Sequence, residues 1–225
     1  MPRGPPPSND SLNEGPREGG GGAGGRDEDP YGYPVSPPGP ACLSANVPPP
    51  PCYSRRVGRM YVCFQCGGAQ DLSYACMVGP CWPMIFVTTG LIAVPTALIL
   101  WGFARNSTAV CAAGGVLCVF VLGAYALTAC RDPGIVQRKQ QPDKPGDLYD
   151  SHARSYRPTN SHYDYESQTL LVRVDHFCPW TGTVIASGNI ISFRIFTNSL
   201  CALTLLCIGI AIWALATQSA PARLS

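Results

Sequence analysis

Asp175, His176 and Cys178 bring a carboxylate, an imidazole and a thiol together within a short stretch of the chain. Pro179 disfavours the α region for the residue before it, so Cys178 is expected in extended or turn geometry. Side chains alternate in an extended chain, which places His176 and Cys178 on the same side, whereas in a helix they would not face each other. The pattern therefore favours a thiol activated by an imidazole that a carboxylate orients. Short motifs also arise by chance, and the alternative is an ordinary loop cysteine.

Two stretches of this chain resemble the motifs of a known family. The run from Asp175 to Gly182, DHFCPWTG, with Asn189 and Phe193 after it, closely resembles the motif of the Asp-His-His-Cys (DHHC) family of protein S-acyltransferases, or palmitoyltransferases. A second triplet resembles the family's Asp-Pro-Gly motif and likewise follows a hydrophobic segment. The resemblance covers roughly residues 60–215. The matching residues outside the catalytic triplet are Asp132, Pro133, Gly134, Pro179, Trp180, Gly182 and Asn189.

The resemblance implies a membrane enzyme that moves a long-chain acyl group, palmitoyl, from acyl-CoA to protein cysteine thiols. Cys178 would be the nucleophile and form an acyl-cysteine intermediate, with His176 as its base and Asp175 fixing the imidazole tautomer. The expected partners are acyl-CoA as co-substrate, protein substrates with membrane-proximal cysteines, and the lipid bilayer. Membranes of the Golgi or the endoplasmic reticulum are the expected location. The formal charge of +2 gives no reason to expect nucleic acid as a partner.

The departures from the family pattern fall on positions that bind two structural zinc ions in the family. Phe177 replaces its second histidine, and Val184 stands where a cysteine is expected. Four more positions lack the family's histidine or cysteine: Tyr163, Asp164, Ser167 and Leu170. No cysteine occurs between Cys130 and Cys178, and the other histidines of the chain are His152 and His162. Since two ligands do not make a zinc site, we expect no metal in this segment and no cofactor besides the acyl-CoA co-substrate.

These losses leave open a second hypothesis, a catalytically weak or inactive membrane pseudoenzyme or scaffold of the same family. Structural zinc contributes on the order of 10–16 kcal/mol to small modules, so residues 131–174 would need packing in its place. A third possibility is a generic small membrane protein whose motif matches are decayed remnants. The sequence favours the active enzyme, because the residues that are kept carry the chemistry and those that are lost carry the metal.

The composition indicates a disordered segment joined to membrane spans, and not one soluble globule. Charged residues make up 13% of the chain, which contains 24 Gly and 23 Pro. Residues 1–59 are expected to form a disordered Gly/Pro-rich cytosolic tail. Residues 60–83 form a Cys-rich juxtamembrane segment, where either zinc binding or reduced, acylated thiols would account for Cys63, Cys66, Cys76 and Cys81.

Three apolar runs are long enough to cross a bilayer as helices, which predicts a mainly α-helical multi-pass membrane protein. Residues 84–130 are expected to form a transmembrane helical hairpin and residues 195–217 a third transmembrane helix, followed by a short tail at 218–225. Residues 131–194, the DHHC-like segment, carry eight Lys or Arg, against Arg105 alone in the hairpin turn. The positive-inside rule therefore places this segment and the N-terminus in the cytosol. Since family members usually have a fourth span, the chain is expected to be a fragment, a mispredicted gene product or a reduced paralogue.

Overall fold

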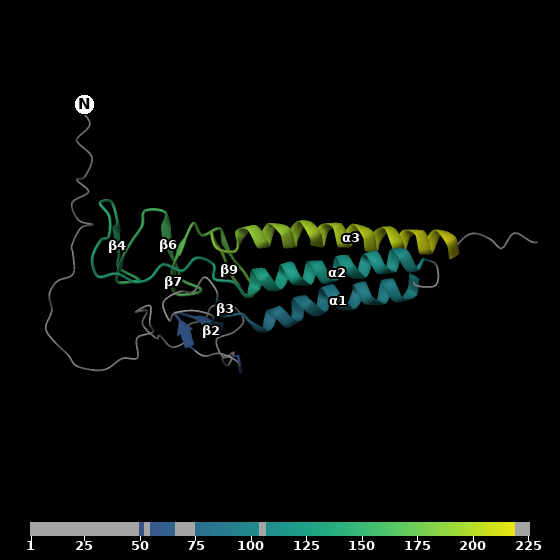
Figure 1. Cartoon of the computed structure of the whole chain (residues 1–225), viewed down its shortest axis with the longest axis horizontal. Coiled ribbons are helices and arrows are strands. Elements are labelled where there is room, and N and C mark those ends of the chain that lie inside the picture. The colour runs from purple at the N-terminus through teal and green to yellow at the C-terminus, as the bar shows by residue number, and fades with distance from the viewer. Residues whose placement is uncertain (1–49, 52–54, 66–74, 104–106, 219–225) are drawn as a thin grey trace, which may run out of the picture.

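The computed structural model describes residues 50–51, 55–65, 75–103 and 107–218 of the chain. Figure 1 shows the helices of this part lying side by side, with the strands gathered at one end of them. The predicted tail at 1–59 lies mostly outside the described residues, as do Cys66, Arg105 and most of the short tail at 218–225. The described architecture is a helix bundle that carries a small β region at one end.

Within the described residues, three helices are long and apolar enough to cross a membrane. They are α1 (Pro83–Phe103), α2 (Thr108–Ala129) and α3 (Ile190–Gln218), with mean hydropathies of 2.0, 2.3 and 2.3 in their most apolar stretches. The predicted class, a mainly α-helical multi-pass membrane protein, is confirmed. Helix α3 begins at Ile190, before residue 195, because the Phe193 N–H donates to the Asn189 carbonyl and starts the helical hydrogen bonds there.

The helices pack through a shared apolar core. The rings of Tyr125 on α2 and Phe196 on α3 lie 5.0 Å apart, centroid to centroid. A Cβ atom on Gly114 of α2 would lie 2.7 Å from a methyl carbon of Leu100 on α1, so this glycine allows the two helices to approach closely. The buried members of the core are Ile92, Val121, Ala124, Tyr125, Phe196, Leu203 and Cys207.

The β region of the described residues consists of one three-stranded sheet and three hairpins, all antiparallel. The sheet has the order β1-β2-β3, formed by Arg55–Val57, Met60–Gln65 and Ala75–Val78. The hairpins are β4–β5 (Leu148–Asp150 with Ser155–Arg157), β6–β7 (Ser161–Asp164 with Thr169–Val172) and β8–β9 (His176–Cys178 with Thr183–Ile185). From sequence, only the extended geometry around Cys178 was predictable, because strands of three or four residues carry no clear alternation.

A second apolar core holds the β region together. Ile135, which directly follows the Asp-Pro-Gly motif, packs against two adjoining clusters of buried side chains. One cluster comprises Val57, Met60, Val62, Met77, Ala153 and Leu170. The other comprises Leu171, Val184 and Ala186. The three-stranded sheet, the motif and the hairpins therefore share one packed interior outside the helix bundle.

The positions of the helix ends predict the membrane topology. The ring of Trp213, near the end of α3, packs edge-on against Phe103 at the end of α1, with centroids 5.0 Å apart. The end of α3 therefore lies beside the end of α1, opposite the strands (Figure 1). If the strand-bearing end faces the cytosol, as the distribution of Lys and Arg predicts, the C-terminal end faces the lumen.

A protease added to sealed microsomes should therefore digest a tag at Met1 and spare a tag at Ser225, as read by immunoblotting. Detergent should make both tags digestible, which controls for a tag that is intrinsically resistant. Digestion of the Ser225 tag in sealed vesicles would show that α3 does not cross the bilayer.

Candidate active site

The predicted catalytic triplet, Asp175, His176 and Cys178, lies on strand β8 and directly before it. Cys178 ends the strand and pairs with Thr183 across the β8–β9 hairpin, so the extended geometry that Pro179 predicted is present. The turn closes through the Gly182 N–H, which donates to the Pro179 carbonyl at 3.0 Å. Gly182 has φ of +70°, a left-handed conformation that favours glycine. His176 starts the same strand and lies on the same face as Cys178.

The structure brings Asp175 and His176 together but leaves the thiol apart from them. His176 Nδ1 lies 3.7 Å from Asp175 Oδ1, and the two side chains are 43% and 57% exposed. Cys178 is a free thiol and only 7% exposed. Within the part of the chain that the structure describes, no hydrogen bond joins the His176 imidazole to the Cys178 thiol. The His176 ring packs edge-on against the ring of Phe193 on α3, with 5.4 Å between the centroids. The predicted nucleophile, Cys178, and the predicted base, His176, thus share a strand but differ in their exposure to solvent.

Two membrane helices hold the turn that follows Cys178. The Trp180 carbonyl accepts hydrogen bonds from the Thr88 hydroxyl of α1 and the Tyr125 hydroxyl of α2, each at 2.8 Å. The Trp180 side chain itself is exposed. Neither Thr88 nor Tyr125 was predicted as a site residue, because their only signal in the sequence is a hydroxyl group in an otherwise apolar run.

Asn189 joins the β8–β9 hairpin to the helices. Its side chain is fully buried, and its Oδ1 accepts a hydrogen bond from the Ala186 N–H at 2.9 Å. Its Nδ2 donates to the carbonyls of Val184 in β9 at 2.9 Å and Thr128 near the end of α2 at 3.3 Å. A buried amide that is paired in this way fixes three segments at once. Asn189, a residue of the motif, therefore has a structural role in this chain.

The Asp-Pro-Gly motif forms a turn against the residues that precede α3. Asp132 Oδ1 accepts hydrogen bonds from the N–H groups of Gly134 and Ile135 at 2.9 and 3.0 Å. Gly134 has φ of +105°, which favours glycine. The Gly188 N–H donates to the Pro133 carbonyl at 2.9 Å. The motif thus links the end of α2 to the residues directly before α3.

The juxtamembrane segment packs against the turn of the hairpin. The Cys81 N–H donates to the Gly182 carbonyl at 3.3 Å. A Cβ atom on Gly79 would lie 2.0 Å from the Gly182 oxygen, so only glycine allows this approach. Cys76 is a free thiol, whereas Cys81 is disulfide-bonded, a state that neither expectation for this segment included.

Positions at which the resemblance implies zinc ligands form cross-strand apolar pairs in this chain. Tyr163 of β6 pairs with Leu170 of β7, and Phe177 of β8 pairs with Val184 of β9. Leu170 and Val184 are fully buried. Tyr163 packs against the cluster of Leu170, and Phe177 packs against the cluster of Val184. At positions that hold metal ligands in the family, this chain therefore has apolar or aromatic side chains that pack between the strands of two hairpins and the core.

The other two positions are engaged in hydrogen bonds. The Ser167 hydroxyl, which is buried, lies 2.8 Å from the Thr169 hydroxyl. Asp164 Oδ2 accepts a hydrogen bond from the Ser167 N–H at 2.7 Å, which closes the β6–β7 turn. Burial raises the pKa of the Tyr163 hydroxyl above its usual value of 10.0, and the nearby Asp150 carboxylate adds to the rise, so this phenol stays protonated at neutral pH. Among the described residues no group of three or more His, Cys, Asp or Glu is arranged to hold a metal, and these positions do not fit zinc.

Comparison with protein families agrees with this geometry. Residues 144–222 match the family model described as DHHC palmitoyltransferase. The match runs from the β4–β5 hairpin through the catalytic triplet and along α3. No curated protein matches the chain. Residues 144–222 are thus similar to the DHHC family of protein S-acyltransferases, which supports membership of that family, and this segment includes α3, one of the helices long and apolar enough to cross a membrane.

Because apolar side chains pair across the hairpins at positions where the family binds zinc, we expect the stability of this protein to be independent of zinc. Chelator should leave the unfolding midpoint of the purified protein unchanged, and elemental analysis should give well under one zinc per chain. Leu170→Ala should lower the free energy of unfolding by about 2–5 kcal/mol, the usual cost of emptying a packed site. Denaturant titration of the tyrosine and tryptophan fluorescence measures this change.

Leu148→Ala is the matched control, because Leu148 is exposed on β4 and its truncation should change the free energy of unfolding by about 0.5 kcal/mol or less. Near-stoichiometric zinc that persists after Cys63→Ser and Cys66→Ser would contradict the prediction, since the metal would then sit in the hairpins.

Proposed function

We propose that this chain is an active protein S-acyltransferase in which Cys178 carries a long-chain acyl group, palmitoyl, from acyl-CoA to protein cysteine thiols. The observation that carries the proposal is the place of Cys178, which is a free thiol in a turn held to the ends of α1 and α2. A thiol at this position can meet both a membrane-dissolved thioester and a cysteine of a membrane-proximal protein segment. Acyl-CoA, such protein substrates and the bilayer are therefore the proposed partners.

The chemistry needs two exchanges of one thioester for another. In the first, the Cys178 thiolate sulfur attacks the thioester carbonyl carbon, the new S–C bond forms, and the CoA thiolate leaves. His176 takes the thiol proton and returns it to the CoA sulfur. In the second, the thiolate of a substrate cysteine attacks the acyl-Cys178 carbonyl and releases the Cys178 sulfur. Asp175, whose carboxylate lies 3.7 Å from the imidazole, orients the base.

Side-chain rotation has to bring the imidazole and the thiol together in this mechanism. Both side chains project from the same face of β8, so the strand itself need not rearrange. Catalytic hydrogen bonds are often long in the absence of substrate and shorten only in the reacting complex. The exposed His176 ring, which packs on Phe193, is the group with room to move.

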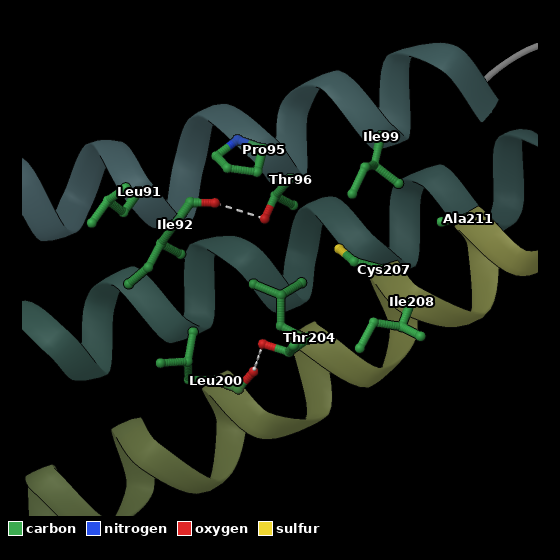
Figure 2. Close-up of a pocket in the computed structure, with 11 residues that line it drawn as sticks. Leu91, Ile92, Pro95, Thr96, Ile99, Leu200, Thr204, Cys207, Ile208 and Ala211 are labelled. Atoms are coloured by element: carbon green, nitrogen blue, oxygen red, sulfur yellow. Dashed lines mark hydrogen bonds between the residues drawn. The ribbon is translucent and has the colours of Figure 1, made fainter.

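A cavity between α1 and α3 supports the placement of the acyl tail. Its volume is about 340 Å³, and Figure 2 shows that side chains of both helices line it. Leu91, which lines the cavity, is one helical turn from Thr88, the residue bonded to the Trp180 carbonyl. Burying each CH₂ of a tail is worth about 0.8 kcal/mol. The other lining residues include Ile92, Pro95, Ile99, Leu200, Leu203, Cys207 and Ile208.

The competing proposal is a weak or inactive pseudoenzyme of the same family. The observation that favours it is the state of the triplet, in which Cys178 is buried and makes no hydrogen bond to His176 in the described residues. A Golgi or endoplasmic reticulum membrane is the location that we propose for either function, on the family resemblance alone.

Loading with labelled palmitoyl-CoA separates the two proposals. The purified chain should take up label that hydroxylamine removes, because a thioester is labile to it. Cys178→Ala should abolish this loading. His176→Ala should slow it by roughly 10²–10⁴-fold, the usual size of a lost general base. Scintillation counting of the isolated protein measures the rate.

Cys201→Ala is the matched control, because Cys201 is an exposed thiol on α3. The Cys201→Ala variant should take up label at the wild-type rate. Label that persists undiminished in Cys178→Ala would mean passive acylation of other cysteines, and the pseudoenzyme proposal would then stand.

A further inference from the structure

The Trp180 carbonyl accepts hydrogen bonds from hydroxyl groups on two different helices, α1 and α2. The hydroxyls of Thr88 and Tyr125 each lie 2.8 Å from it, although they are separated from it by 92 and 55 residues. Both donors are buried, with Thr88 near the start of α1 and Tyr125 near the end of α2. A carbonyl oxygen has two lone pairs, and both are used here.

Other threonines of the spans donate their hydroxyl hydrogen bonds within their own helix. Thr89, Thr96 and Thr204 each donate to the carbonyl four residues earlier in their own helix. That is the ordinary way in which a hydroxyl is satisfied inside a membrane helix. Thr88 could make the same bond, yet its hydroxyl leaves the helix and reaches the catalytic turn. Thr89, its direct neighbour, therefore provides a natural control.

We propose that Thr88 and Tyr125 are positioning residues, which fix the depth of Cys178 relative to the membrane helices. Cys178 ends β8 and directly precedes the turn that the Gly182 N–H closes onto the Pro179 carbonyl. The Thr181 hydroxyl in this turn also donates to the Cys178 carbonyl at 3.1 Å, so holding the Trp180 oxygen constrains the backbone of Cys178 as well. The catalytic meaning of this depth rests on the proposed acyltransferase function, whereas the positioning itself does not.

The depth of Cys178 matters because the acyl tail of a membrane-dissolved acyl-CoA determines how deep in the membrane its thioester lies. The apolar cavity between α1 and α3 begins at Leu91, one turn deeper than Thr88. A tail in that cavity would place its carbonyl carbon near the end of the bundle, where the two hydroxyls hold the turn. A displacement of about 1 Å in such a geometry can cost roughly 10²-fold in rate.

The test compares full-length Thr88→Val, Tyr125→Phe and the double variant with wild type in lipid nanodiscs. Each single variant should lower the maximal rate of palmitoyl-CoA loading roughly 10-fold, and the double variant roughly 10²-fold, with KM unchanged. Release of the turn should also raise the rate at which a maleimide alkylates Cys178, measured by peptide mass spectrometry. Thr88→Ser should restore both rates toward wild type, because it keeps the hydroxyl.

Thr89→Val is the matched control and should resemble wild type in both measurements, because its hydroxyl is bonded within α1. Circular dichroism identifies any variant that fails to fold, and Thr88→Ser against Thr88→Val then decides the question with the fold kept. Unchanged alkylation and loading in the double variant would overturn the proposal, as would equal losses in Thr89→Val. A wild-type protein that takes up no label would defeat the proposed function alone, since faster alkylation of Cys178 would still support the positioning.

Discussion

The structure depends on a few buried hydrogen bonds that attach the β8–β9 hairpin to the ends of the membrane helices. The amide of Asn189 satisfies one N–H and two carbonyls from two segments, residues 184–186 and the end of α2, and the hydroxyls of Thr88 and Tyr125 satisfy the Trp180 carbonyl. A buried polar group without a partner costs about 1–3 kcal/mol, so each of these contacts opposes separation of the hairpin from the bundle. These hydrogen bonds attach the motif to the ends of the membrane helices. If Thr88 and Tyr125 fix the depth of Cys178, as proposed, a change in that depth would have to break the bonds to the Trp180 carbonyl.

The hairpins themselves are held by packing at positions where the family resemblance implies metal. Cross-strand pairs such as Tyr163 with Leu170, and Phe177 with Val184, bury apolar side chains in the interior of the β region. Such pairs contribute roughly 0.2–1 kcal/mol each beyond their burial, which is far less than a structural zinc ion supplies. The remainder has to come from the shared core with the three-stranded sheet and from the attachment to the helices. Apolar packing at positions where the resemblance implies metal ligands is thus compatible, in one fold, with the presence of Asp175, His176 and Cys178.

The sequence was sufficient for the features that local physics decides. The apolar runs predicted the spans, and Pro179 predicted the extended backbone at Cys178. It was insufficient where distant segments meet: Tyr125 looks like one more aromatic residue in an apolar helix until Trp180, far along the chain, comes beside it. The early start of α3 at Ile190 and the short strands of the β region likewise depend on tertiary contacts. The separation of the thiol from the imidazole was missed for the same reason, because the spacing on the strand predicts the shared face but not the rotamers.

Transfer of the acyl group to an acceptor thiol tests the central claim most directly. Purified acyl-enzyme, freed of acyl-CoA, would be mixed with a membrane-binding peptide that contains one cysteine or, as its control, one serine. Label should leave Cys178 faster as the concentration of the cysteine peptide is increased, and it should appear on that peptide as a thioester. Label that is released only as free fatty acid, at the same rate with either peptide, would contradict the central claim.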